Sequence, residues 1–114
     1  RVAAGPAEGE KGPVLLFDAA TGEVVARTDE LPAGVRSLAF APDGSKLAGG
    51  LADGSARVWD AAGKEAQNLR GHGAKVEAAA WSPDGKRLAT GGPDGVVKLW
   101  DAGTGDELLA LPAP

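Results

Sequence analysis

The fold is decided by residues 76–101, which read VEAAAWSPDGKRLATGGPDGVVKLWD and repeat, without gaps, the stretch VRSLAFAPDGSKLAGGLADGSARVWD at residues 35–60. The two copies lie 41 residues apart, and the motifs Pro-Asp-Gly, Leu-Ala and Trp-Asp recur in the same order. A weaker copy ends at Phe17-Asp18, 42 residues before Trp59-Asp60. Self-similarity at such a period indicates a repeat architecture, so the chain consists of copies of one structural unit.

Turn residues divide each unit into four short strands. In the last copy, Pro83 presets φ, Asp84 can accept hydrogen bonds from its own backbone and Gly85 tolerates positive φ, which together predict a hairpin turn. A second turn is expected at residues 93–95. Sheets of such short strands cannot bury both faces alone, so successive units are expected to stack face to face. The expected strands of the last unit span residues 76–81, 87–91, 96–101 and 107–111.

Composition excludes several classes of protein. The 114 residues include 12 Lys and Arg against 16 Asp and Glu, a net charge of −4 that argues against a nucleic-acid partner. No apolar run approaches the roughly 18 residues that a membrane helix needs, so a membrane partner is not expected either. The absence of cysteine excludes disulfides, thiolate metal sites and a cysteine nucleophile, and leaves the compartment open, with the cytoplasm favoured.

The repeat resembles the WD-repeat β-propeller family. The features that carry the resemblance are the period, Gly71-His72 ahead of a strand, Asp94-Gly95 in a tight turn and Trp100-Asp101 at the end of the unit. The tails WDAAGKE and WDAGTGDELL are similar to bacterial members. The resemblance implies an all-β propeller with two complete four-stranded blades and one incomplete N-terminal blade. The blades are expected at residues 1–27 (incomplete), 28–69 and 70–114.

The number of blades suggests a longer protein. Propellers close with about 4–8 blades, and the repeat arithmetic yields fewer than three. The chain also begins with Arg1 and contains no methionine. We therefore expect a segment of a larger propeller, whose remaining blades would cover the open ends. The alternative is a short chain that assembles with copies of itself.

The resemblance also implies a buried hydrogen-bonded chain that links Trp100, Thr90, His72 and Asp94. These groups can form such a chain, because an indole only donates and a hydroxyl both donates and accepts. A neutral imidazole donates from one nitrogen and accepts at the other. Satisfying these groups within the blade would avoid the cost of burying them alone.

The middle unit departs from this pattern. Leu31 stands where His72 has its counterpart, and Gly49 stands where Thr90 has its counterpart. That blade is therefore expected to depend on packing, with Asp53 serving only its own turn.

No catalytic residue, metal ligand or cofactor is predicted. The single histidine occupies a structural position of the family, and the acidic residues of the Asp-Gly pairs are explained by turn geometry. Their spacing lacks the alternation of a calcium loop. No Gly-x-Ser-x-Gly occurs, and the Gly-rich stretches lack the Gly-Lys-Ser/Thr ending of a phosphate loop.

The remaining candidate for function is a surface. The family's blade order places the turns at residues 28–34, 51–54, 70–75 and 92–95 on one ring face, joined by residues 6–13. We hypothesise a protein or peptide partner there; the alternative is a set of solvated loop charges. The candidate partner-binding residues are Arg36, Arg70, Lys75 and Glu77, with Asp29 and Glu30 beside them.

The sequence thus favours a non-catalytic interaction scaffold, part of a WD-repeat propeller in a larger multidomain protein of bacterial type. The alternatives are a propeller enzyme whose site lies in other blades, or a propeller fused to a kinase, protease or cytochrome module that carries the activity.

Overall fold

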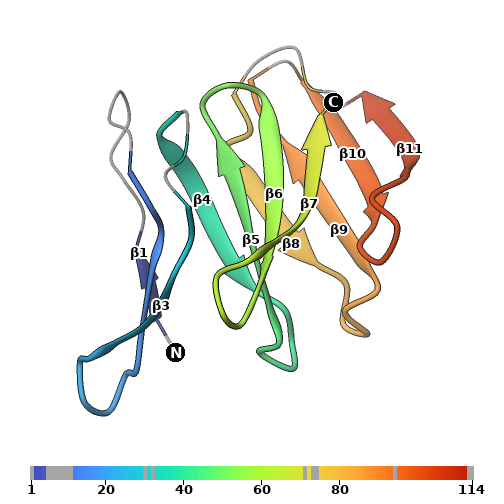
Figure 1. Cartoon of the computed structure of the whole chain (residues 1–114). Helices are drawn as coiled ribbons and strands as arrows, with labels where there is room; N and C mark the ends of the chain where they lie inside the picture. Colours follow the sequence, from blue (N-terminus) through green and yellow to red (C-terminus); the bar gives the residue numbers. More distant parts are fainter. Residues whose placement is uncertain are drawn as a thin grey trace.

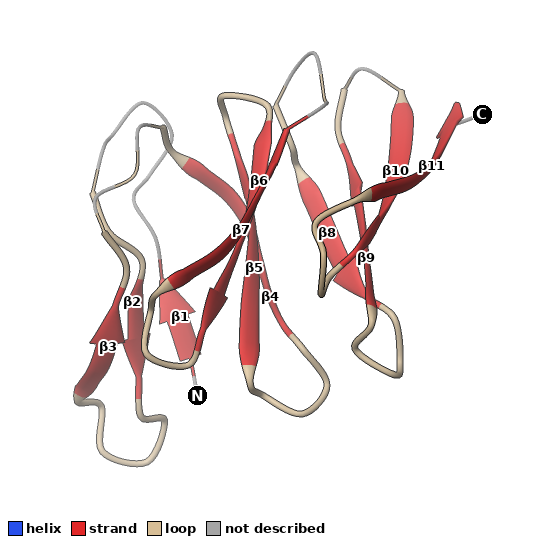
Figure 2. Cartoon of the chain, turned by 45° about the vertical axis from the view of Figure 1, so that its right-hand side comes forward, coloured by secondary structure: helices blue, strands red, loops and turns tan. Residues whose placement is uncertain are grey.

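Strands form the whole regular structure in the part of the chain that the computed structural model describes, which is residues 2–4, 12–29, 31, 33–70, 72, 75–93 and 95–112. The first sheet has three antiparallel strands in the order β1-β2-β3 (Figure 1; β2 is labelled in Figure 2). These strands are β1 (Val2–Ala4), β2 (Leu15–Phe17) and β3 (Val24–Arg27).

The second and third sheets have four antiparallel strands each, in the orders β4-β5-β6-β7 and β8-β9-β10-β11. The expected architecture of two complete sheets and one incomplete sheet is thus confirmed. The second sheet contains β4 (Val35–Phe40), β5 (Lys46–Leu51), β6 (Ser55–Asp60) and β7 (Glu65–Arg70). The third contains β8 (Ala78–Trp81), β9 (Arg87–Gly91), β10 (Val96–Asp101) and β11 (Glu107–Pro112).

Two strand boundaries of the last unit differ from the prediction: β11 ends at Pro112, one residue later than expected, and β8 begins at Ala78 and not at residue 76. The amide of Val76 donates to the carbonyl of Leu51, 3.0 Å away in the second sheet. That amide is therefore committed to the neighbouring sheet and is not available to a ladder within its own sheet.

The Pro-Asp-Gly motifs form the expected hairpin turns. Gly85 adopts φ 72° and its amide donates to Ser82 O at 2.9 Å. Asp84 Oδ1 accepts hydrogen bonds from Ser82 Oγ at 2.6 Å and from the amide of Lys86 at 3.0 Å. The corresponding carboxylate of the second sheet, Asp43, accepts from the amide and hydroxyl of Ser45.

These turn carboxylates make stability depend on pH. The hydrogen bond from the Ser82 hydroxyl, aided by the Lys86 amide, holds the pKa of Asp84 below its usual 3.8, and the bonds from Ser45 do the same for Asp43. The folded chain therefore binds fewer protons than the unfolded chain as pH falls below about 3.8. We expect the melting temperature to fall through that range, and to fall less steeply in D43N/D84N. An unchanged pH profile in the double variant would contradict this assignment.

The three sheets stack face to face as successive blades of an open, partial propeller (Figure 2). One buried cluster lies between the first and second sheets, and another lies between the second and third. Face-to-face burial of this kind is the expected solution for short strands that cannot cover both faces alone. The first cluster contains Val14, Leu16, Leu31, Leu47, Leu51 and Trp59; the second contains Ala48, Ala56, Val58, Leu69, Val76, Leu88 and Trp100.

Candidate partner-binding face and its buried supports

A buried hydroxyl connects three of the four residues expected to form a hydrogen-bonded chain. Trp100 Nε1 on β10 donates to Thr90 Oγ1 on β9 at 2.8 Å, and His72 Nε2 lies 2.7 Å from the same oxygen. Thr90 and Trp100 are only 2% and 3% exposed. Asp94, the fourth predicted member, lies outside the described residues.

The roles in this cluster follow from the chemistry of the groups. The indole N–H has no capacity to accept, so Thr90 Oγ1 must be the acceptor from Trp100. The hydroxyl hydrogen then points to His72 Nε2 when that nitrogen carries no proton. The cluster therefore connects the segment that leads into β8 with the middle of the third sheet.

Removing the imidazole tests this role. H72A is expected to lower the free energy of unfolding by about 1–3 kcal/mol, because the buried Thr90 hydroxyl loses a partner. Chemical denaturation followed by circular dichroism measures the change. H72Q, whose amide can replace one hydrogen bond, should recover part of the loss; a neutral H72A variant would contradict the assignment.

In the middle blade, apolar packing of Leu31 and Trp59 takes the place of the hydrogen-bonded cluster. Leu31 and Trp59 are 2% and 1% exposed and belong to one buried cluster. A Cβ atom at Gly49 would lie 2.9 Å from two ring carbons of Trp59, so the missing side chain leaves room for the indole. The space that Thr90 fills in the third sheet is thus occupied here by the tryptophan ring.

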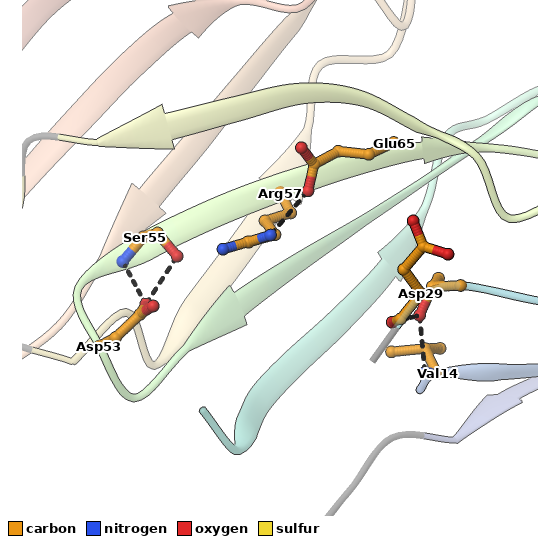
Figure 3. Close-up of polar contacts among 7 residues, drawn as sticks. Val14, Asp29, Asp53, Ser55, Arg57 and Glu65 are labelled. Atoms are coloured by element: carbon orange, nitrogen blue, oxygen red, sulfur yellow. Dashed lines mark hydrogen bonds and ion pairs between the residues drawn. The ribbon is translucent and has the colours of Figure 1, made fainter. Parts of the chain in front are cut away.

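Asp53 serves its own turn, as Figure 3 shows. Its Oδ1 accepts from the Ser55 amide at 2.9 Å and from Ser55 Oγ at 2.6 Å. Partial burial raises the pKa of Asp53, but the Ser55 hydrogen bonds and the positive charges of Arg57 and Arg70 outweigh it and hold this pKa below its usual value.

The candidate face lies at the end of the sheets where β4 begins, β5 turns into β6 and β7 ends, at the top of Figure 1. Arg36 Nη2 and Glu77 Oε1 lie 2.9 Å apart there and form an ion pair between the second and third sheets. These two residues occupy the same position in successive repeats. Arg70 is exposed at the end of β7, and half-buried Lys75 precedes β8.

Sequence reasoning missed contacts between neighbouring blades. Trp81 Nε1 donates to the carbonyl of Ala39 at 2.9 Å, which joins β8 to β4. Gln67 Nε2 donates to the carbonyl of Gly103 at 3.1 Å, which joins β7 to the turn after β10. The only available signal was the indole of Trp81 at the position of Phe40, because a half-buried N–H needs an acceptor.

Two ion pairs within the sheets were also missed. Arg57 Nη1 lies 2.8 Å from Glu65 Oε1, and Lys98 Nζ lies 2.6 Å from Glu107 Oε1. Both pairs join the third and fourth strands of a complete sheet, so they are equivalent positions of the repeat. The recurrence of a basic and an acidic residue at these positions was the signal that could have found them.

The described ranges contain neither a metal-binding group of side chains nor a membrane-spanning helix. Among these residues, no group of three or more His, Cys, Asp or Glu side chains is placed to hold a metal ion. None of the described residues forms a helix that is long and apolar enough to cross a membrane.

Comparison with known proteins agrees with the architecture. The profile of the WD domain, G-beta repeat, matches residues 27–60 and 63–101. The WD40 repeat protein poxJ of Penicillium oxalicum is 56% identical over 46 residues, which are 40% of this chain and 13% of that protein. The protein of the same name from P. oxalicum strain 114-2 / CGMCC 5302 matches equally. This chain therefore spans about 13% of the length of these curated relatives.

Both relatives are fungal, so the resemblance of the two tails to bacterial members has no support in these comparisons. The two profile matches end at Asp60 and Asp101, each at the end of a Trp-Asp pair. Because they cover more than half of the chain in two successive copies, the protein belongs to the WD40-repeat family.

Proposed function

We propose that this chain is part of a non-catalytic scaffold that binds a protein or peptide through the face carrying Arg36, Arg70, Lys75 and Glu77. WD40-repeat proteins generally mediate protein interactions, and the family is typically non-catalytic. The scaffold function of this particular chain, and the residues assigned to it, are our inference.

The ion pair between Arg36 and Glu77 carries the proposal. Its side chains are 25% and 44% exposed, so a partner can still reach both charges. Partly exposed ion pairs contribute at most about 1 kcal/mol to the stability of the fold. Exposed charges contribute more to the specificity and rate of partner binding, which is the role we assign to this pair. Because the pair joins two stacked sheets, it offers one donor and one acceptor in a fixed orientation.

We further propose that these blades, divided at residues 1–27, 28–69 and 70–114, belong to a larger propeller in a multidomain protein. Several apolar side chains on the outermost elements support this, because they are about half exposed where a further blade or domain would cover them. They are Val24 and Val25 on β3, and Leu108, Leu109 and Leu111 on β11.

Charge reversal tests the face. Peptides that bind the 114-residue chain would first be selected from a random displayed library. Their dissociation constants for the wild-type chain and for R70E/K75E would then be measured by fluorescence anisotropy. For peptides that bind this face, we expect the dissociation constant to rise about tenfold, equivalent to about 1.4 kcal/mol. R87E is the matched control, because Arg87 is exposed at the opposite end of the third sheet. Equal affinity in R70E/K75E, or an equal loss in R87E, would contradict the proposal.

A further inference from the structure

A cleft of about 280 Å³ lies between the first and second sheets, and neither Arg36 nor Glu77 lines it. Asp29, two residues past β3, lines the side of the first sheet. Arg57 on β6 and Glu65 at the start of β7 line the side of the second sheet, and Figure 3 shows these three side chains. Leu31 and Trp59, both buried, complete the lining.

The accessible charge in this cleft is negative. Arg57 is only 12% exposed and its Nη1 is engaged by Glu65 Oε1 at 2.8 Å. Its Nε is buried without a hydrogen-bond partner among the described residues, so that donor faces no solvent. The Glu65 side chain is 39% exposed and Asp29 is exposed. A molecule entering the cleft therefore meets two carboxylates before it meets the guanidinium.

The carboxylate of Asp29 forms no hydrogen bond or ion pair within the described part of the chain. The residue's backbone carbonyl accepts from Thr28 Oγ1 at 2.9 Å. Two carboxylates against one guanidinium leave the cleft with one excess negative charge. A carboxylate or phosphate ligand would be repelled there, whereas a cation would be attracted.

We propose that this cleft binds the side chain of an arginine or lysine from a basic segment of a protein partner. The charged end of that side chain would donate to the Asp29 and Glu65 carboxylates. Arginine fits better than lysine, because its planar fork of donors can serve two carboxylates at once. The net charge of −4 also favours the approach of a basic partner.

The equivalent position of the next repeat differs from this cleft in its charge. Arg70 stands where Asp29 has its counterpart, 41 residues later, and His72 stands in place of Leu31. There His72 is hydrogen-bonded to Thr90, and the charge at the Asp29 position is reversed. The proposal thus rests on the residues of one cleft and does not depend on the ring-face proposal.

The test uses the tripeptide amide N-acetyl-Gly-Arg-Gly, titrated into the ¹⁵N-labelled 114-residue chain and followed by NMR. We expect shifts at the amides of Leu31, Trp59 and Glu65. The version with citrulline, which has the same shape without charge, should bind at least fivefold more weakly. D29N should weaken the arginine peptide about fivefold, whereas R70Q should leave its affinity within twofold.

Three outcomes would overturn the proposal: equal binding of the citrulline peptide, unchanged affinity in D29N, or tighter binding of N-acetyl-Gly-Glu-Gly amide. The last outcome would make Arg57 the recognition group and the cleft an anion site. Because Asp29 is exposed and its side chain bonds to no described residue, D29N should keep the wild-type spectrum elsewhere. D29K provides a second variant, in which binding of the arginine peptide should be abolished.

Discussion

Replacing Trp59 by alanine is expected to lower the free energy of unfolding by about 3–5 kcal/mol, the usual cost of truncating a large aromatic side chain in a core. Trp59 is 1% exposed and packs in the cluster between the first and second sheets. The glycine at position 49 adds to the cost, because no side chain there can move into the vacated space. The loss is a large fraction of the total stability of an ordinary domain, about 5–15 kcal/mol.

Urea denaturation followed by circular dichroism measures the change. V25A is the matched control, since Val25 is 47% exposed and its truncation should change stability by less than about 0.5 kcal/mol. If W59A and V25A had similar unfolding midpoints, the cluster between the first two sheets would not contribute as the structure indicates.

Substitution of Gly63 by alanine is expected to cost about 2–5 kcal/mol. Gly63 adopts φ 83°, a left-handed conformation that costs an L-residue about 1–2 kcal/mol. A Cβ atom there would also collide with the carbonyl oxygen of Arg27 and lie 2.6 Å from its carbonyl carbon. Because that neighbour is backbone at the end of β3, relief requires the first two sheets to move apart, which adds about 1–3 kcal/mol.

Gly44 separates these two contributions. It has nearly the same conformation, φ 74°, and closes a similar turn, but no atom lies within 4 Å of its Cβ position. G44A should therefore show the conformational cost alone, about 1–2 kcal/mol. Equal losses in G63A and G44A, measured by the same denaturation, would show that the contact with Arg27 carries no energy.

The sequence predicts the sheets well because each one depends on local chemistry. The Pro-Asp-Gly turn needs only residues 83–85 and their neighbours, and the strands β9 and β10 begin and end where the turns require. The start of β8 was wrong, since the amide of Val76 bonds to Leu51 in another sheet. No pattern within one repeat can show that such an amide is shared between sheets.

The candidate sites show the same difference between contacts that follow from the repeat and contacts that depend on the spacing of two sheets. The positions of His72, Thr90 and Trp100 in the repeat implied their contacts, and the structure brings the three together. The sequence placed Arg36 and Glu77 on one face but did not pair them, because their contact depends on how closely two sheets approach. The cleft beside Asp29 depends on the same distance between sheets, so it could not be found before the fold.

The contacts between the second and third sheets have a consequence for the curvature of the molecule. Their inner strands, β4 and β8, touch and are joined by the Trp81–Ala39 hydrogen bond, whereas the outer edge is joined through Gln67 and Gly103. These contacts at the inner and outer edges act together with the buried cluster between the two sheets, and they restrict rotation of one sheet relative to the other. The Gln67 side chain therefore contributes to the spacing of the two sheets at their outer edge, while the buried cluster sets it further in.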